Sequence, residues 1–356
     1  MELKLKPIEL VGISVVLALC CLPSKASAKP QVPCYFVFGD SLSDNGNNND
    51  LATLAKVNYP PYGIDFPQGP TGRFSNGRNM QDFIVERLGF KDYVPPFAEL
   101  GQKNIFNGVN YASGSAGILD ETGINLGVRI PLNQQIENHK TIISTITRLM
   151  QNHLATNLLL SQCIYSIQIG SNDYLNNYFN SDFYNTSQRY TPMEFATVLV
   201  QQLSVQLMDL YENGARKFAV YGLGGIGCAP YIISAIGADT SGCVDKFNEA
   251  ATLFNDRLKP VVNQLNKNLP DAKFTYLNPS GDPAGLVTNG TCCEMGGGGG
   301  ELCIPNSTPC SERSRYVFWD GVHPAEAWNK IIAESAYSSK SSVEASPFNI
   351  QQLAKE

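Results

Sequence analysis

The sequence is poor in histidine, in charged residues and in long apolar runs. Only three of its 356 residues are histidine, 16% are charged, and the formal net charge is −6. A chain with this acidic balance is not expected to bind nucleic acid or an anionic membrane surface. Beyond residue 28 no segment approaches the roughly 20 apolar residues that cross a bilayer, so we expect no stable membrane insertion.

The first 28 residues have the three parts of a cleaved secretory signal. Lys4 and Lys6 precede the mainly apolar residues 11–22, and residues 26–28 (Ala-Ser-Ala) supply small side chains for cleavage. We therefore expect a secreted, soluble protein. Residues 29–356 are expected to form one domain, because no linker or charge block divides them.

Cysteines and glycosylation motifs agree with an exported protein. Eight of the ten cysteines follow residue 28, and an even number in an exported chain predicts disulfides. Four of them lie within residues 292–310 and predict a stapled surface loop, with a zinc site as the alternative. Sequons begin at Asn185, Asn289 and Asn306 and predict a glycoprotein.

Predicted strands and helices alternate along the chain. Strands are expected at residues 34–39, 105–113, 163–169, 217–223 and 273–278. Helices are expected at residues 44–56, 79–88, 131–158, 191–212, 244–269 and 325–336. Helical crossovers of this length join parallel strands, so we predict a three-layer α/β domain whose mostly parallel sheet is covered on both faces.

Ser41 directly follows the first predicted strand, in the run CYFVFGDSLSDNGNNN. Ligand crevices form at the carboxyl ends of the strands in open α/β sheets, so Ser41 is a candidate nucleophile. The alternative is a serine that caps a helix beginning near residue 44. Two later strands end in YASGSAG and GSNDY, which places Gly114 and Asn172 at the same edge of the sheet.

His323 is the only histidine in a predicted loop. It lies three residues after Asp320 in YVFWDGVHP, whereas His139 and His153 lie among polar residues of a predicted helix and are expected on its surface. A serine hydrolase needs a base within hydrogen-bond reach of the hydroxyl and a carboxylate that orients the imidazole. His323 is therefore the natural candidate for the base, and a purely structural histidine is the alternative.

Four sequence blocks together carry a family resemblance. GDSLSDNGNNN, VNYASGSAG, IGSNDY and DGVHP, in this order, resemble the plant GDSL esterase/lipase family of the SGNH hydrolase superfamily. The resemblance implies a flavodoxin-like three-layer fold with a five-stranded parallel sheet. It also implies Ser41 as nucleophile, His323 as general base and Asp320 as orienting acid. The implied oxyanion hole consists of the backbone amides of Ser41 and Gly114 with the side-chain amide of Asn172.

The chain departs from the family pattern at two positions. Ser115 stands where a second glycine is frequent, and Ala325 stands where threonine usually follows His-Pro. With Ser115 there, the amide that faces the oxyanion belongs to Gly114 or to its neighbour.

The implied fold also bears on two of the cysteines. It would set the strands of residues 34–39 and 163–169 side by side, with Cys34 and Cys163 at matching heights. Neighbouring strands lie about 4.8 Å apart, within reach of a disulfide. We therefore predict this bridge, with two buried free thiols as the alternative.

The resemblance implies a serine esterase or lipase that hydrolyses a small-molecule or lipid ester through an acyl-enzyme, in the cell wall or apoplast. It implies no cofactor and no metal. A secreted acyltransferase with the same triad is one alternative. A non-catalytic binding relative is the other, although it would have no need of the complete residue set.

An aromatic group and a glycine-rich motif remain to be interpreted. Tyr59, Tyr62, Phe66 and Phe74 either line an apolar acyl groove or pack their own loop down. Residues 222–227 match Gly-x-Gly-x-x-Gly, but Pro230 follows too soon for a phosphate-binding helix, so we interpret them as a turn.

Overall fold

The computed structural model describes residues 29–100, 105–236, 242–297 and 300–356. The predicted signal, residues 1–28, lies outside the described residues. Residues 31–356 cluster into one unit by their contacts. No helix in the described part of the chain is both long and apolar enough to span a bilayer.

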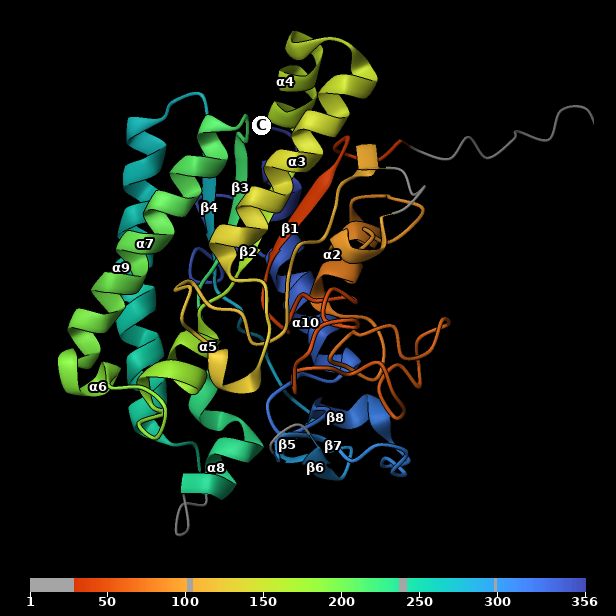
Figure 1. Cartoon of the computed structure of the whole chain (residues 1–356), viewed down its shortest axis with the longest axis vertical. Helices are drawn as coiled ribbons and strands as arrows, with labels where there is room; N and C mark the ends of the chain where they lie inside the picture. Colours follow the sequence, from red (N-terminus) through yellow and green to blue (C-terminus); the bar gives the residue numbers. More distant parts are fainter. Residues whose placement is uncertain (1–28, 101–104, 237–241, 298–299) are drawn as a thin grey trace, which may run out of the picture. The chain divides into compact units, whose positions relative to one another are not determined.

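A five-stranded sheet lies at the centre of this unit (Figure 1). It has the order β1 (Tyr35–Gly39), β2 (Ile164–Gln168), β3 (Lys217–Tyr221), β4 (Lys273–Leu277) and β9 (Ala345–Ser346). The first four strands are parallel, and the short β9 pairs antiparallel with β4. β1 and β2 are buried throughout, as expected of strands that helices cover on both faces.

Alternate side chains of the strands enter two separate cores, which makes three layers. Phe36 and Phe38 pack with the helices α3 (Leu132–Met150), α7 (Pro192–Glu212) and α9 (Asp245–Asn268). Tyr35 and Val37 point to the other face. There they pack with α2 (Met80–Arg87), α10 (Glu326–Ser338) and α11 (Ile350–Leu353), and α2 lies beside α10. The predicted α/β architecture is confirmed.

Short elements complete the described chain. The remaining α-helices are α4 (His153–Gln162), α5 (Ser171–Asp173), α6 (Thr186–Arg189) and α8 (Pro230–Ile236). Two small sheets pair β5 (Val287–Thr291) with β8 (Tyr316–Phe318) and β6 (Met295–Gly297) with β7 (Leu302–Cys303). The four clustered cysteines lie between β5 and β8 in the sequence.

The expected strand at residues 105–113 does not form as a regular strand. The segment runs beside β1, and the amides of Tyr111 and Ser113 donate to the carbonyls of Val37 and Gly39. Only isolated bridges are formed, because the amide of Ala112 donates to the side chain of Asn110 and the backbone of Asn110 bonds to Pro95 and Phe97. The sheet therefore has four parallel strands and one antiparallel strand, and the expectation of five parallel strands is wrong.

Two predicted helices also differ. Residues 44–56 form turns, because Asp44 Oδ1 accepts the amides of Gly46 and Asn47 and so competes with helical bonding. The helix expected over residues 131–158 is divided into α3 and α4. The chain breaks at Gln151, whose φ is 52°, and Asn152 then caps α4.

All eight cysteines of the described chain form disulfides: Cys34–Cys163, Cys228–Cys243, Cys292–Cys310 and Cys293–Cys303. The predicted Cys34–Cys163 bridge is confirmed, and it joins the residues just before β1 and β2, with Cα atoms 4.8 Å apart. The four clustered cysteines form two bridges, so the stapled loop is confirmed and the zinc alternative is wrong. Four disulfides fit an extracellular protein.

Candidate active site

Ser41 lies in a tight turn at the carboxyl end of β1. The amides of Ser43 and Asp44 donate to the carbonyl of Asp40 at 3.1 and 2.9 Å, and the amide of Leu42 donates to Asp40 Oδ1 at 3.0 Å. No helix begins here, so Ser41 is not a helix cap. The turn instead holds the serine at the edge of the sheet with its hydroxyl toward His323.

A hydroxyl, an imidazole and a carboxylate follow one another at hydrogen-bond distances. His323 Nε2 lies 2.8 Å from Ser41 Oγ. His323 Nδ1 lies 2.9 and 2.8 Å from the two carboxylate oxygens of Asp320. An imidazole held in this way can accept the hydroxyl proton while the carboxylate stabilises the resulting cation.

The turn after β8 fixes the carboxylate. Asp320 is fully buried, and its Oδ1 accepts the backbone amides of Val322 at 2.9 Å and His323 at 2.7 Å. Tyr62 donates to Oδ2 at 2.6 Å. Burial lowers the pKa of His323, but the charge and hydrogen bond of Asp320, together with the charges of Glu301 and Asp40, raise it, and the net shift is upward.

The backbone amides of Ser41 and Ser115 donate to no described residue. Both residues line the cavity at the site, whereas Gly114 does not. The amide of Gly114 instead donates to Asp44 Oδ2 at 3.0 Å. The structure thus differs from the expectation for Gly114, because Asp44 already occupies that amide.

Close packing explains a glycine at position 114. A Cβ there would lie 2.7 Å from both Asn48 Nδ2 and Phe74 Cζ. Phe74 in turn packs on the imidazole of His323, with ring centroids 4.7 Å apart. Ser115 follows with a φ of 62°, and its buried hydroxyl oxygen has no hydrogen-bond partner in the described chain.

Asn172 lines the same cavity from α5. Its Nδ2 donates to the carbonyl of Ala116 at 3.0 Å, and Asn176 donates to its Oδ1 at 2.8 Å. The neighbouring Asp173 accepts the amide of Ile118 at 2.8 Å and the hydroxyl of Thr122 at 2.7 Å. These bonds tie α5 to the loop that carries Ser115.

The cavity at the site has a volume of about 1010 Å³. Ser41, His323 and Asn172 line it together with the glycine-rich run 222–225, which approaches the site from the end of β3. Many of the other lining residues are apolar, among them Leu126, Leu175, Leu223, Ile226, Val317 and Trp328. An ester with a sizeable apolar group is therefore compatible with this cavity.

The four aromatic residues of the loop over residues 59–74 divide between lining the cavity and packing the loop down. Phe74 lines the cavity. Tyr62 and Phe66 are buried, and Tyr62 packs edge-to-face on Tyr59, so these residues hold the segment in place. Packing is thus the main role of the segment, and one ring reaches the cavity.

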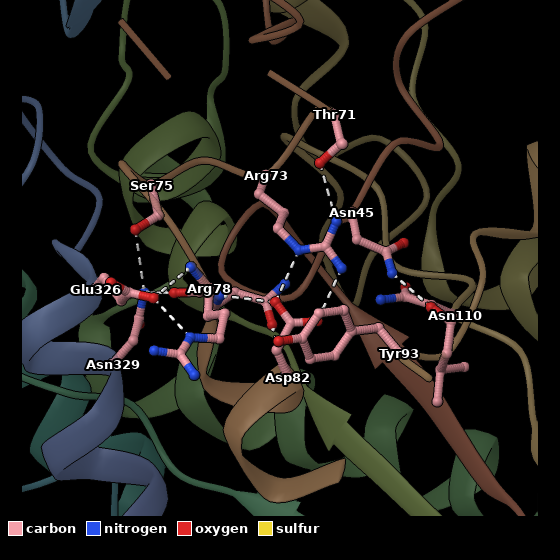
Figure 2. Close-up of polar contacts among 12 residues, drawn as sticks. Asn45, Thr71, Arg73, Ser75, Arg78, Asp82, Tyr93, Asn110, Glu326 and Asn329 are labelled. Carbon is pink, nitrogen blue, oxygen red and sulfur yellow. Dashed lines mark hydrogen bonds and ion pairs between the residues drawn. The ribbon is translucent and has the colours of Figure 1, made fainter. Parts of the chain in front are cut away.

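A buried ion pair, which the sequence analysis missed, anchors the residues around Phe74. Figure 2 shows Arg73 facing Asp82, and its Nε and Nη2 donate to the two carboxylate oxygens at 2.7 and 2.8 Å. Asp82 also accepts the amide of Asn79 in the capping box of α2. The Asn-x-x-Asp spacing of that box was the available signal.

Two acidic groups near the imidazole were also missed. Burial raises the pKa of Asp40 to about 7, although the charge of His323 opposes this shift. Burial likewise raises the pKa of Glu301 to about 7. Both residues line the cavity. Glu301 follows the run of glycines, which gives no periodic signal from which its position could be predicted.

The remaining predicted residues divide between surface and core. Asn185, Asn289 and Asn306 are exposed, and their glycosylation stays a prediction. His153 is exposed as expected, but His139 is fully buried, and its expected surface position is wrong. Within the described residues no group of three or more acidic, histidine or cysteine side chains is arranged to hold a metal ion.

Comparison with known proteins places the chain in one family. The sequence model of the GDSL-like Lipase/Acylhydrolase family matches residues 35–336. The Arabidopsis thaliana protein GDSL esterase/lipase At1g29670 is 47% identical over 355 residues, covering 96% of this chain and 97% of that protein. Another from the same plant, GDSL esterase/lipase At5g45670, is 46% identical over 353 residues, covering 96% and 98%. The chain therefore belongs to the GDSL-like lipase/acylhydrolase family and is an esterase/lipase.

Proposed function

We propose that the protein hydrolyses carboxylic esters through a covalent acyl-enzyme on Ser41. The observation that carries the proposal is the 2.8 Å distance between His323 Nε2 and Ser41 Oγ, with Asp320 bonded to the far side of the imidazole. His323 accepts the hydroxyl proton as Ser41 Oγ attacks the ester carbonyl. The C–O bond to the alcohol then breaks, and the alcohol leaves with the proton from His323.

Water completes the reaction by the same route in reverse. His323 takes a proton from water, the hydroxide equivalent attacks the acyl carbonyl, and the proton returns to Ser41 Oγ as the acid leaves. We assign the oxyanion to the amides of Ser41 and Ser115 and to the side chain of Asn172. Removal of one such donor typically costs about 3 to 4 kcal/mol of transition-state stabilisation.

The substrate is an ester with an apolar acyl or alkyl group. The support is the apolar part of the lining of the cavity. Export into the cell wall or apoplast is part of the proposal. It is supported by the four disulfides and by the signal pattern of residues 1–28.

The proposal is tested with p-nitrophenyl esters of short and long acyl chains and with an acetylated sugar. We expect turnover by the purified secreted protein, and a loss of turnover in Ser41→Ala with an unchanged melting temperature. Addition of an alcohol measures transfer, and a dominant ester product would favour the acyltransferase. Activity retained in a well-folded Ser41→Ala protein would contradict the nucleophile.

A further inference from the structure

Tyr62 contacts the orienting carboxylate from a distant part of the chain. Its hydroxyl donates to Asp320 Oδ2 at 2.6 Å, although 258 residues separate the two. The side chain is buried, with 1% of the residue exposed. A hydrogen bond in so dry a place is stronger than the same bond in water, since water does not compete for either partner.

The hydrogen bonds of Asp320 divide unequally between its two oxygens. Oδ1 accepts the amides of Val322 and His323, which belong to the same turn. Oδ2 accepts the hydroxyl of Tyr62 and lies 2.8 Å from Nδ1 of His323. Within the described chain, Tyr62 is thus the only donor to Asp320 from outside the turn that carries it.

The neighbours of Tyr62 fix the direction of its hydroxyl. The amide of Cys303 donates to the phenol oxygen at 3.1 Å, so the phenol proton is directed to Asp320. Cys303 is bridged to Cys293, and Tyr59 donates to its carbonyl at 3.1 Å. Burial and the charge of Asp320 hold the pKa of Tyr62 well above its usual value, so the phenol remains a donor.

We propose that Tyr62 is a positioning residue of the reaction, whose hydroxyl orients Asp320 and draws part of the carboxylate charge away from His323. This inference rests on the proposed function. The neutral phenol stabilises the carboxylate without adding charge, so the carboxylate attracts a proton on the imidazole less strongly. Without the hydroxyl, Asp320 Oδ2 interacts with the imidazole alone, and the pKa of His323 rises further.

Other titratable groups face the same imidazole. Glu301 and Asp40 both act on His323 through their charge, and the pKa of each is raised by burial to about 7. These carboxyls change charge near pH 7, and each change alters the electrostatic field at the imidazole. A single pH profile therefore reports the titration of all three groups together. Only a comparison of matched variants measures the contribution of Tyr62.

The structure offers a matched pair of variants, Tyr62→Phe and Tyr59→Phe. Each removes one hydroxyl bonded to Cys303, but only Tyr62 also bonds Asp320. In Tyr62→Phe we expect the acid limb of kcat/KM to move upward by about half a pH unit or more. We also expect kcat on the plateau to fall about tenfold with KM nearly unchanged, whereas Tyr59→Phe follows the parent.

A second substitution is expected to shift the acid limb of kcat/KM in the opposite direction. Site-specific replacement of Tyr62 by 3-fluorotyrosine retains the ring and makes the hydroxyl a stronger donor. The acid limb should then move downward, because more charge is drawn away from the imidazole. A loss of packing does not produce shifts of opposite sign in these two variants.

NMR titration of the His323 ring measures the same pKa without turnover, so it decides the role of Tyr62 even in a chain that cleaves no ester. Failure of the proposed function would appear as an absence of Ser41-dependent turnover. Failure of the Tyr62 inference would appear as superimposed titrations of the parent, Tyr59→Phe and Tyr62→Phe. An upward shift that occurs only in Tyr62→Phe supports it.

Discussion

His323 Nε2 lies 2.8 Å from Ser41 Oγ, although 282 residues separate the two in sequence. Ser41 lies in the turn after β1, and His323 precedes α10 near the other end of the chain. The amide of Glu326, at the start of α10, donates to Asn76 Oδ1 at 2.8 Å and so ties α10 to the segment before α2. Completion of the site therefore depends on most of the fold.

Asn172→Ala tests the proposed role of the Asn172 side chain as an oxyanion donor. An oxyanion donor acts mainly when charge develops on the substrate oxygen, so we expect kcat to fall about a hundredfold to a thousandfold with KM nearly unchanged. Steady-state kinetics on a p-nitrophenyl ester, with a melting curve as control, measures this. A kcat within a few-fold of the parent would remove Asn172 from the oxyanion hole.

Ser115→Gly tests whether position 115 contributes its amide or its hydroxyl. The serine has a φ of 62° and a buried hydroxyl without a partner, so glycine should stabilise the fold by about 1 kcal/mol or more. Activity should stay within a few-fold, because the amide remains. A hundredfold loss of kcat would instead assign a role to the hydroxyl.

Ser113→Ala is the matched control for that loop. The hydroxyl of Ser113 is also buried, but it donates to Asn48 Oδ1 at 2.6 Å and accepts the amide of Ile130 at 3.0 Å. Its removal should lower the free energy of unfolding by about 1 to 3 kcal/mol.

His139→Phe tests a buried imidazole far from the triad in sequence. Burial lowers the pKa of His139 from 6.5 to about 3, so below pH 6.5 the unfolded chain binds a proton that the folded chain does not. The parent should therefore lose stability relative to the variant as pH falls from 7 toward 4. Urea unfolding at both pH values measures this, and a constant difference between the proteins would contradict it.

Removal of single disulfides distinguishes bridges that affect only the free energy of unfolding from a bridge that also affects the active site. The Cys34–Cys163 bridge spans 129 residues and the Cys293–Cys303 bridge spans 10, so their removal should cost about 5 and 3 kcal/mol. Only the second pair contacts Tyr62, through the amide of Cys303. Paired Cys→Ala variants should therefore show the larger loss of stability for the first bridge and the upward shift of the kcat/KM acid limb for the second.

The sequence was most informative where apolar periodicity was strong. The strands of the parallel sheet and α2, α7, α9 and α10 lie close to their predicted ranges. Ser41, Asp320 and His323, which the structure brings within hydrogen-bond distance of one another, were chosen from the sequence because they lie just after a strand or just before a helix. Long-range partners of these residues, such as Tyr62 for Asp320, have no local signal.

Polar side chains made the buried face of α3 and the turns after Ser41 hard to predict from the sequence. The buried face of α3 carries Gln135 and His139 beside Ile136, and Gln135 bonds both backbone groups of Gly39. Polar residues at core positions look like surface in a sequence, although the helical spacing from Ile136 through His139 to Ile142 was available. A helix was expected after Asp44, but turns form instead. The carboxylate of Asp44 accepts the amides of Gly46 and Gly114, and the second of these bonds depends on the fold.

Covalent labelling with a fluorophosphonate tests the central claim most directly. The reagent reacts with a serine hydroxyl that a neighbouring base activates, and peptide mass spectrometry identifies the modified residue. We predict one adduct on the peptide that contains Ser41, no adduct in folded Ser41→Ala, and much slower labelling in His323→Ala. An adduct on a different serine, or equal labelling of Ser41→Ala, would contradict the assignment of Ser41 as the nucleophile.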